Sequence, residues 1–331
     1  MPIRFFLILL FFVSISALTD AQIRYTVNRS VSTPTPIPIQ VSPPVKEEVA
    51  EYTSIHSVPI GWKIDYEDAI ETARISSRNL LIYLYVEKDV VIPDELAALP
   101  IVSGCRQFDT VVLDNAFVRS GLCRYVLLKL PMNAQIFDNS GIKTPIYALP
   151  GFEHMTGHPG LVVIDFANRD ASHYGDVVGI LPFFQGICPT ADQTEIFLKL
   201  PPGTLTQRTL TYAVRVHHDQ PLSADGEPAP IVVQMATEHA LYQAERGYLT
   251  HVNFGVRSYR AKEVLGGGSP AEICAQSQSG VGLFEGAIGC MRAWRYSSAH
   301  WSIARKSQTY YGYDMVLGNN GAWYAVGFFI N

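Results

Sequence analysis

Four short apolar runs in the first half of the chain constrain its fold more than any other feature. Each run has the length of a strand, and leucine, β-branched and aromatic residues dominate all four. They are LLIYLYV (80–86), YVLLKLP (125–131), LVVIDF (161–166) and VVGILPF (177–183). Runs of this kind are typical of strands covered on both faces. Helical spacing precedes the first two, at 62–73 and 105–115, so we predict an α/β unit around a sheet with the last run at its edge.

The second half of the chain has a different pattern. Helical spacing covers 231–247 and ends at a glycine, and apolar residues line one face of a further helix over 283–294. A serine after Tyr296 is placed to cap a short helix around His300. Two β-rich runs, YYGYDMVL and AWYAVGFFI, close the chain, and the Gly-Asn-Asn-Gly between them favours a tight hairpin turn. Helices followed by a terminal hairpin predict an α+β unit.

The first 54 residues indicate export. Residues 1–21 have an early arginine, an apolar run and a small-residue ending, the pattern of a signal peptide cleaved after Ala21. A membrane anchor is the alternative, but the run is shorter than the about 20 apolar residues that a span needs. Residues 22–54 contain STPTPIPIQVSPP, a Pro-rich linker. We therefore expect a secreted or periplasmic protein with no transmembrane segment after cleavage.

The charge of the chain argues against a nucleic-acid-binding protein, and its cysteine content argues against a disulfide-built scaffold. Lys and Arg number 25 against 30 Asp and Glu, for a net charge of −5, and no basic block would neutralise phosphates. We therefore expect no nucleic acid partner. Five cysteines are too few for a disulfide-built scaffold, no pair has zinc-ribbon spacing, and we assign no bridge. A Pro-Pro-Gly at 201–203 predicts two folded units, 55–200 and 203–331.

In the first unit, CRQFDTVVLDN leads into a strand, and a proline, Pro159, precedes a later strand. Residues 60–190 with these features resemble the thioredoxin fold, in which a helix follows a Cys-x-x-Cys motif and a cis-proline precedes a strand. The resemblance puts Cys105 in the second cysteine position and Pro159 in the cis-proline position. Val102 replaces the first cysteine, so the dithiol is missing, and an insertion at 87–101 also departs from the family.

Cys105 has two interpretations. A cysteine at a helix N-terminus can be a reactive thiol, because that position lowers its pKa. Free cysteines are more often buried and structural, and we favour this interpretation for Cys105. The first unit is then a binding or structural module, and a thiol-disulfide oxidoreductase is a distant alternative.

Four motifs of the second unit occur in order. They are AxxHAxxQAxxGxLxH (236–251), PAEICA (270–275), AWRYSSAHW (293–301) and the closing hairpin (311–329). These residues resemble the CAP superfamily, the cysteine-rich secretory, antigen and pathogenesis-related proteins, whose domain is also called the SCP domain. The resemblance implies an α-β-α sandwich over 203–331. The overall expectation is a thioredoxin-like α/β sheet domain followed by a CAP-like α+β domain.

The CAP resemblance also implies a ligand-binding cleft. Its two histidines and one of its two acids match His251, His300 and Glu272, whereas Ser297 stands where the second acid is expected. Two imidazoles and a carboxylate could hold a divalent metal such as zinc and leave a position open for water. They could equally form a hydrogen-bonded polar cluster.

Two functions follow from these observations. The first is a binding module for an unknown protein, peptide or lipid ligand, favoured by the missing acid, the missing cysteine and the many aromatic residues of the second unit. The second is a metal-assisted, peptidase-like hydrolase using His251, His300 and Glu272. The histidine pair His217-His218 and the glycines at 266–268 match no site pattern.

Overall fold

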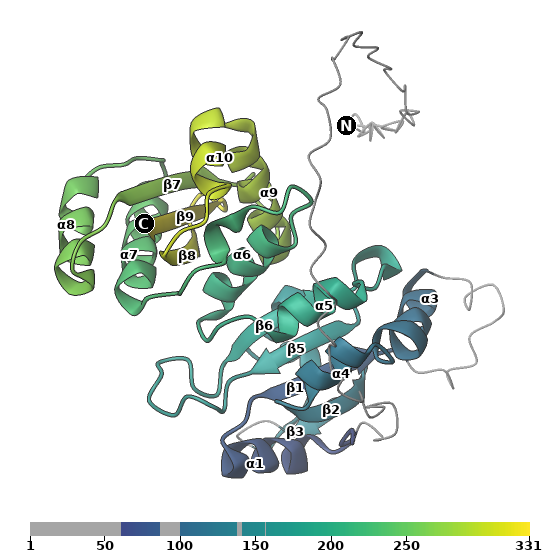
Figure 1. Cartoon of the computed structure of the whole chain (residues 1–331). Helices are drawn as coiled ribbons and strands as arrows, with labels where there is room; N and C mark the ends of the chain where they lie inside the picture. The colour runs from purple at the N-terminus through teal and green to yellow at the C-terminus, as the bar shows by residue number, and fades with distance from the viewer. Residues whose placement is uncertain (1–60, 87–99, 138–140, 156) are drawn as a thin grey trace, which may run out of the picture. The chain divides into compact units, whose positions relative to one another are not determined.

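The computed structural model describes residues 61–86, 100–137, 141–155 and 157–331, which all lie in one compact unit from Thr53 to Asn331. The predicted signal peptide, the Pro-rich linker and nearly all of the 87–101 insertion lie outside the described residues. Within the described ranges, no helix is long and apolar enough to cross a membrane. The fold is mixed α/β, as predicted (Figure 1).

The first half contains a four-stranded sheet in the order β2-β1-β5-β6. Its strands are β1 (Leu80–Tyr85), β2 (Val126–Pro131), β5 (Gly160–Ile164) and β6 (Val177–Pro182). β1 pairs with β2 in parallel and with β5 in antiparallel orientation, and β6 is antiparallel to β5. All four predicted strands are therefore confirmed, with β6 at an edge.

Helices and buried side chains cover both faces of this sheet. The helices are α1 (Tyr66–Ser76), α3 (Pro100–Gln107), α4 (Ala116–Leu122) and α5 (Ala191–Leu198). Leu80 and Ile82 face α1, whereas Leu81 and Tyr83 alternate with them and face α3, α4 and α5. The short elements are η2 (Phe108–Val112), β3 (Gln135–Phe137), β4 (Lys143–Pro145), η3 (Ile146–Ala148), η4 (Phe152–Met155) and η5 (Phe184–Gly186).

Three expectations for this half need correction. The first helix begins four residues later than its apolar spacing suggests, because the Asp65 side chain caps it by accepting from the Asp68 N–H at 2.8 Å. The helix expected over 105–115 is α3 followed by the π-helical turn η2, so Cys105 lies in the last turn of α3 and not at its start. None of the described peptide bonds is cis, so Pro159 is not a cis-proline.

The second half is built on a three-stranded antiparallel sheet in the order β7-β9-β8. Its elements are α6 (Leu205–Arg215), η6 (Leu222–Ala224), α7 (Pro230–Arg246), α8 (Phe254–Leu265), β7 (Pro270–Gln276), α9 (Leu283–Tyr296), α10 (Ser298–Ala304), β8 (Tyr310–Leu317) and β9 (Trp323–Ile330). Val326 and Phe328 of β9 pack under α7 and α8, whereas Ala325 and Phe329 face α6, α9 and α10. The sheet therefore lies between two helix layers (Figure 1).

Helix α6 packs against strands of both sheets, β6 and β8. One continuous cluster of buried apolar side chains includes Ile180 of the first sheet and Met315 of the second. The predicted boundary at 201–203 falls between α5 and α6, where the buried Arg208 donates from Nη1 to the carbonyl oxygens of Leu200 (3.0 Å) and Pro201 (2.7 Å). The α6 layer thus connects the two halves through buried contacts.

Candidate functional site

Strand β7 carries two polar side chains of the site on one face. Glu272 and Cys274 are two residues apart, so they project from the same side of the strand. Ile273 between them faces the opposite side and joins the core that includes α9. β7 is an edge strand with a neighbouring strand on one side only. The segment that follows α7 can therefore come round its open side and approach Glu272 and Cys274.

The glycine that ends α7 and the serine that begins α10 position the two histidines at this face of β7. Gly247 ends α7 in the left-handed conformation (φ 73°), which lets the chain turn toward His251. His300 lies in the first turn of α10, where its backbone N–H donates to Ser297 Oγ at 3.5 Å. Ser297 is the position at which the CAP resemblance expects an acid, and in this chain it caps the helix.

A buried ion pair fixes the carboxylate of Glu272, whose side chain is 1% exposed. Arg257 of α8 donates from Nε to Oε2 (2.8 Å) and from Nη2 to Oε1 (2.9 Å). Its remaining nitrogen, Nη1, donates to the Val252 carbonyl oxygen at 2.8 Å. This two-pronged geometry neutralises the carboxylate and holds both of its oxygens.

His251 is oriented by the same carboxylate. Its Nδ1 lies 2.9 Å from Glu272 Oε1, and half of its side chain (50%) is exposed. A carboxylate only accepts hydrogen bonds, so Nδ1 carries the proton and donates it. In the tautomer that this hydrogen bond selects, Nε2 on the opposite side of the ring is unprotonated and available to a ligand.

His300 is the neighbour of His251 in the cleft. The ring centroids are 5.9 Å apart, with an angle of 48° between the planes. Burial, and then the nearby His251, lower the pKa of His300, so this imidazole is neutral at pH 7. The structure thus brings together all three residues predicted from the sequence, and we call His251, Glu272 and His300 the histidine cleft.

His239 of α7 and Cys274 lie beneath the histidine cleft. His239 Nε2, Cys274 Sγ and a Glu272 oxygen lie within 4.8 Å of one another. His239 Nε2 donates to the Thr250 carbonyl oxygen at 2.6 Å, so it has no free electron pair for a metal. Burial, and then the charge of Glu272, raise the pKa of the Cys274 thiol. With Glu272 held by Arg257, this buried group supports the cleft and is a poor metal site.

Two residues of this site, Arg257 and His239, are not predicted from the sequence. His239 occupies a core position in the apolar pattern of its helix, and that pattern hides its polar role. Arg257 belongs to no motif, since only the burial of Glu272 creates the need for a cation. The one signal for Arg257 is Glu272 itself, because an acid that becomes buried needs a positively charged partner nearby.

Cys105 belongs to a separate, buried region of the first half. It is 5% exposed, and burial raises the pKa of its thiol. The Tyr83 hydroxyl lies 3.4 Å from the Cys105 carbonyl oxygen and donates to it. All five cysteines of the chain are described, and none forms a disulfide. A buried thiol with a raised pKa is poorly suited to redox exchange.

No protein-family model and no curated protein matches the chain. A solved structure to which the chain is similar is an outer surface protein from Borrelia burgdorferi. The two share 20% sequence identity with a TM-score of 0.26, over 32% of this chain and 77% of that protein. A TM-score this low carries no argument about the fold or the function of this chain.

Proposed function

We propose that the chain is an exported binding protein, secreted or periplasmic, that holds its ligand in the histidine cleft. One observation carries this proposal: the carboxylate of Glu272 is engaged by Arg257 and His251. The open groups of the cleft are then two imidazoles. They can bind a ligand through hydrogen bonds or a metal ion, and neither is paired with a free carboxylate base.

A divalent metal such as zinc fits part of this donor set. His251 and His300 would be the metal ligands, since both rings are partly accessible. Glu272 fits as the group that orients His251, because histidine ligands commonly donate their other ring nitrogen to a carboxylate. As a direct ligand Glu272 fits poorly, since Arg257 already occupies both oxygens.

Zinc is therefore the first probe of the histidine cleft. We expect the full chain, stripped with chelator and titrated with zinc, to bind one equivalent. The His251→Ala and His300→Ala variants should each bind zinc at least about tenfold more weakly, because each loses one of two ligands. His154→Ala, a histidine outside the cleft, is the control. Calorimetry measures all four proteins, and unchanged binding in both cleft variants would contradict a metal at this site.

Ligand binding without a metal is tested separately. The immobilised full chain is exposed to peptide and lipid panels, with and without zinc. A ligand that wild type binds and the His251→Ala/His300→Ala double variant loses supports the proposed function. Panels that contain no such ligand, in both conditions, count against it.

A metal-assisted hydrolase is the second candidate, and the orientation of His251 by a carboxylate favours it. It would need a general base, a role for which the ion-paired Glu272 is poorly placed. A peptidase screen separates the two functions, because a hydrolase should show turnover that chelator abolishes and His300→Ala lacks. A thiol-disulfide oxidoreductase has the least support, since Val102 replaces the first cysteine and Cys105 is buried.

A further inference from the structure

Helices α9, α10 and the end of α6 form a second concave surface. It consists of two adjoining hollows, of about 590 Å³ and about 440 Å³, and Arg295 and Tyr296 line both. We call the two hollows together the α9–α10 groove. Each is within the about 300–1,000 Å³ range of sites that bind small groups.

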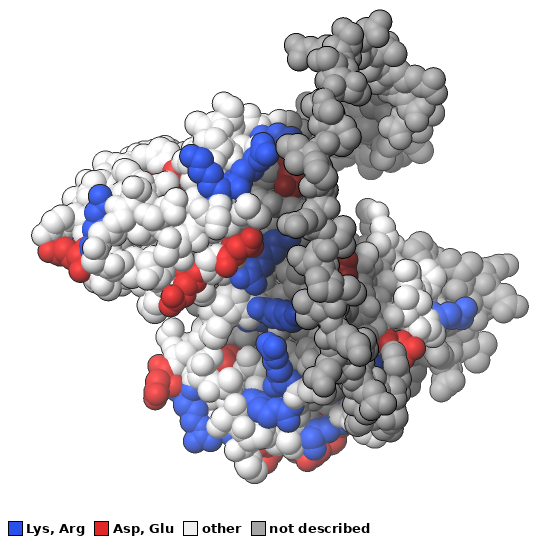
Figure 2. All heavy atoms as spheres, viewed as in Figure 1, with Lys and Arg blue, Asp and Glu red and all other residues white. Residues whose placement is uncertain are grey.

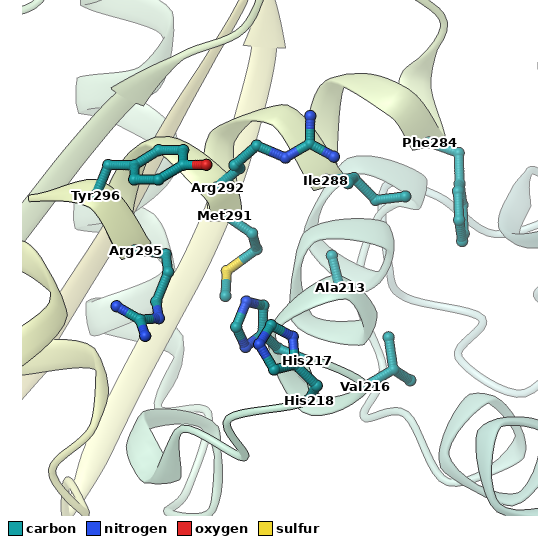
Figure 3. Close-up of a pocket in the computed structure, with 10 residues that line it drawn as sticks. All are labelled: Ala213, Val216, His217, His218, Phe284, Ile288, Met291, Arg292, Arg295 and Tyr296. Atoms are coloured by element: carbon teal, nitrogen blue, oxygen red, sulfur yellow. The ribbon is translucent and has the colours of Figure 1, made fainter. Parts of the chain in front are cut away.

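The larger hollow has an apolar floor. Phe284, Ile288 and Met291 project from α9, and Ala213 and Val216 from the end of α6. Figure 3 shows these side chains around the hollow, with His217 and His218 at its rim. Ile288 is 41% exposed, so an apolar group entering the hollow would cover surface that is now in water.

The smaller hollow combines the aromatic rings of Tyr296 and Trp301 with hydrogen-bonding groups. Trp301 lines it together with the hydroxyl-bearing Ser298 and Ser302 and the guanidinium of Arg305. Tyr296, between the hollows, is 84% exposed. Both hollows therefore offer apolar area next to polar groups, the composition of surfaces that bind peptides.

Each hollow also has an unpaired arginine. Arg295 forms an ion pair with Asp219, whose other oxygen lies 3.0 Å from His218 Nε2. Among the residues that the structure describes, no carboxylate pairs with Arg292 in the larger hollow or with Arg305 in the smaller. Figure 2 shows Lys and Arg side chains gathered over α9 and α10. The groove is therefore positive in a chain whose net charge is −5.

His217 adds no positive charge to the groove at pH 7. Burial, and then the neighbouring His218, lowers the pKa of His217, while Asp219 acts in the opposite direction. The ring is thus neutral at pH 7, and it stacks on His218 with 4.3 Å between centroids. The groove offers its positive charge through arginines, which bind carboxylates in a defined geometry.

We propose that the α9–α10 groove binds an extended peptide segment of a partner protein in which acidic and apolar residues alternate. Two observations favour a peptide over a single-chain lipid carboxylate. The unpaired arginines lie in different hollows, so a ligand with several carboxylates can reach both at once. In the smaller hollow, Ser298 can hydrogen bond to a peptide backbone, and Ser302, whose hydroxyl donates to the Ala299 carbonyl oxygen at 2.8 Å, can accept from a peptide N–H. This inference goes beyond the proposed function, because it assigns a surface that the histidine cleft does not use.

A labelled synthetic peptide tests the proposal. The probe is a fluorescein-labelled peptide made of two consecutive Glu-Leu-Ser-Glu-Phe-Ser units. Fluorescence anisotropy measures its binding to the full chain. We expect Arg292→Gln and Arg305→Gln each to weaken binding about two- to fivefold, as for the loss of one exposed ion pair. Ile288→Ser should weaken it about fivefold or more, and 500 mM salt should weaken wild-type binding. Arg124→Gln, an exposed arginine outside the groove, is the matched control.

Two further peptides and one lipid complete the test. A peptide with Gln in place of Glu, and one with Ser in place of Leu and Phe, should each bind more weakly than the probe. Equal binding of either peptide, or unchanged binding in both arginine variants, would overturn the proposal. Decanoate is the lipid arm: if it binds in an Arg292-dependent way and the probe does not bind, the groove takes lipid carboxylates and the peptide proposal is wrong.

Discussion

Helix α8 forms one ion pair with β7 and another with α7, and the two show how burial changes the role of the same chemistry. Arg257 and Glu272 have side chains that are 8% and 1% exposed, and they lie 2.7 Å apart. Arg260 and Glu238 lie 2.8 Å apart, but both side chains are 42% exposed. Water screens the second pair and not the first. The buried pair therefore has the larger effect on the histidine cleft, because Glu272 also orients His251.

Removing Arg257 should destabilise the fold. We expect Arg257→Met to lower the free energy of unfolding by about 3–5 kcal/mol, because it leaves the buried Glu272 carboxylate without the guanidinium that neutralises it. Arg260→Met should cost less than about 1 kcal/mol. The double variant Arg257→Met/Glu272→Met should recover part of the loss, since neither charge is then left alone. Urea unfolding followed by circular dichroism measures all three, and equal losses for the two arginine variants would show that Arg257 is not in a buried pair.

At the scale of residues, the sequence predicts the residues of the histidine cleft better than the residues that support them. His251, Glu272 and His300 could be found because each matches a motif position. Arg257 could not, since its role depends on α8 packing against β7, a contact between segments about 15 residues apart that no local pattern encodes. Cys105 shows the opposite case, in which a local helix pattern was read from the wrong starting residue.

Helix α7 approaches the second sheet so closely that β8 needs a glycine at the contact. A Cβ atom at Gly312 would lie 2.4 Å from the Val232 carbonyl oxygen and 2.5 Å from Val233 Cα. Both are backbone atoms of α7, which cannot move aside as a flexible side chain would. Gly255, near the start of α8, has nothing within 4 Å of its Cβ position.

The two glycines make a matched pair of substitutions. Gly312→Ala should lower the free energy of unfolding by about 1–3 kcal/mol, because the helix must shift away from the sheet. Gly255→Ala should raise it by up to about 1 kcal/mol, because alanine loses less backbone entropy in a helix. Thermal and urea unfolding of the two variants measure the difference. A neutral Gly312→Ala would mean that α7 does not pack this closely on β8.

At the scale of elements, the strands that are apolar runs and the terminal hairpin could be predicted from the sequence. Strand β7 (PAEICA) was not predicted as a strand, because a buried glutamate and a cysteine interrupt its apolar character. The start of α1 was also placed too early, since the capping aspartate decides it and the apolar spacing does not. Capping and buried polar residues thus determine where such elements lie, and the spacing of apolar residues does not reveal this.

At the scale of the whole described molecule, α6 joins the two sheets. Its residues Leu210, Ala213 and Val214 belong to the buried cluster that contains strand residues of both sheets, and the Phe184 ring of the first half meets the Phe284 ring of the second at 5.4 Å between centroids. A shared core of this kind makes the two sheets stabilise each other. The Pro-Pro-Gly at 201–203 indicates a chain turn, and composition alone does not reveal whether the segments on its two sides share a core.

We expect the two sheets to unfold together. In hydrogen exchange followed by mass spectrometry at increasing urea, peptides from β1 and β5 should lose protection at the same concentration as peptides from β8 and β9. Gly312→Ala, although it lies in the second sheet, should lower that concentration equally for both groups of peptides. Loss of protection in the second sheet alone would show that the halves fold independently.

The strand order β7-β9-β8 also has a consequence for biosynthesis. A ribosome makes β9 after both of its neighbours, so β7 and β8 emerge with no partner between them. Until β9 follows, both strands present unpaired edges to other chains, a state prone to aggregation. The first sheet is complete once β6 has been made. At that later stage the nascent chain therefore contains one complete sheet and a second sheet that lacks its middle strand, β9. A chaperone acting on this protein during translation would therefore be needed most over residues 270–322.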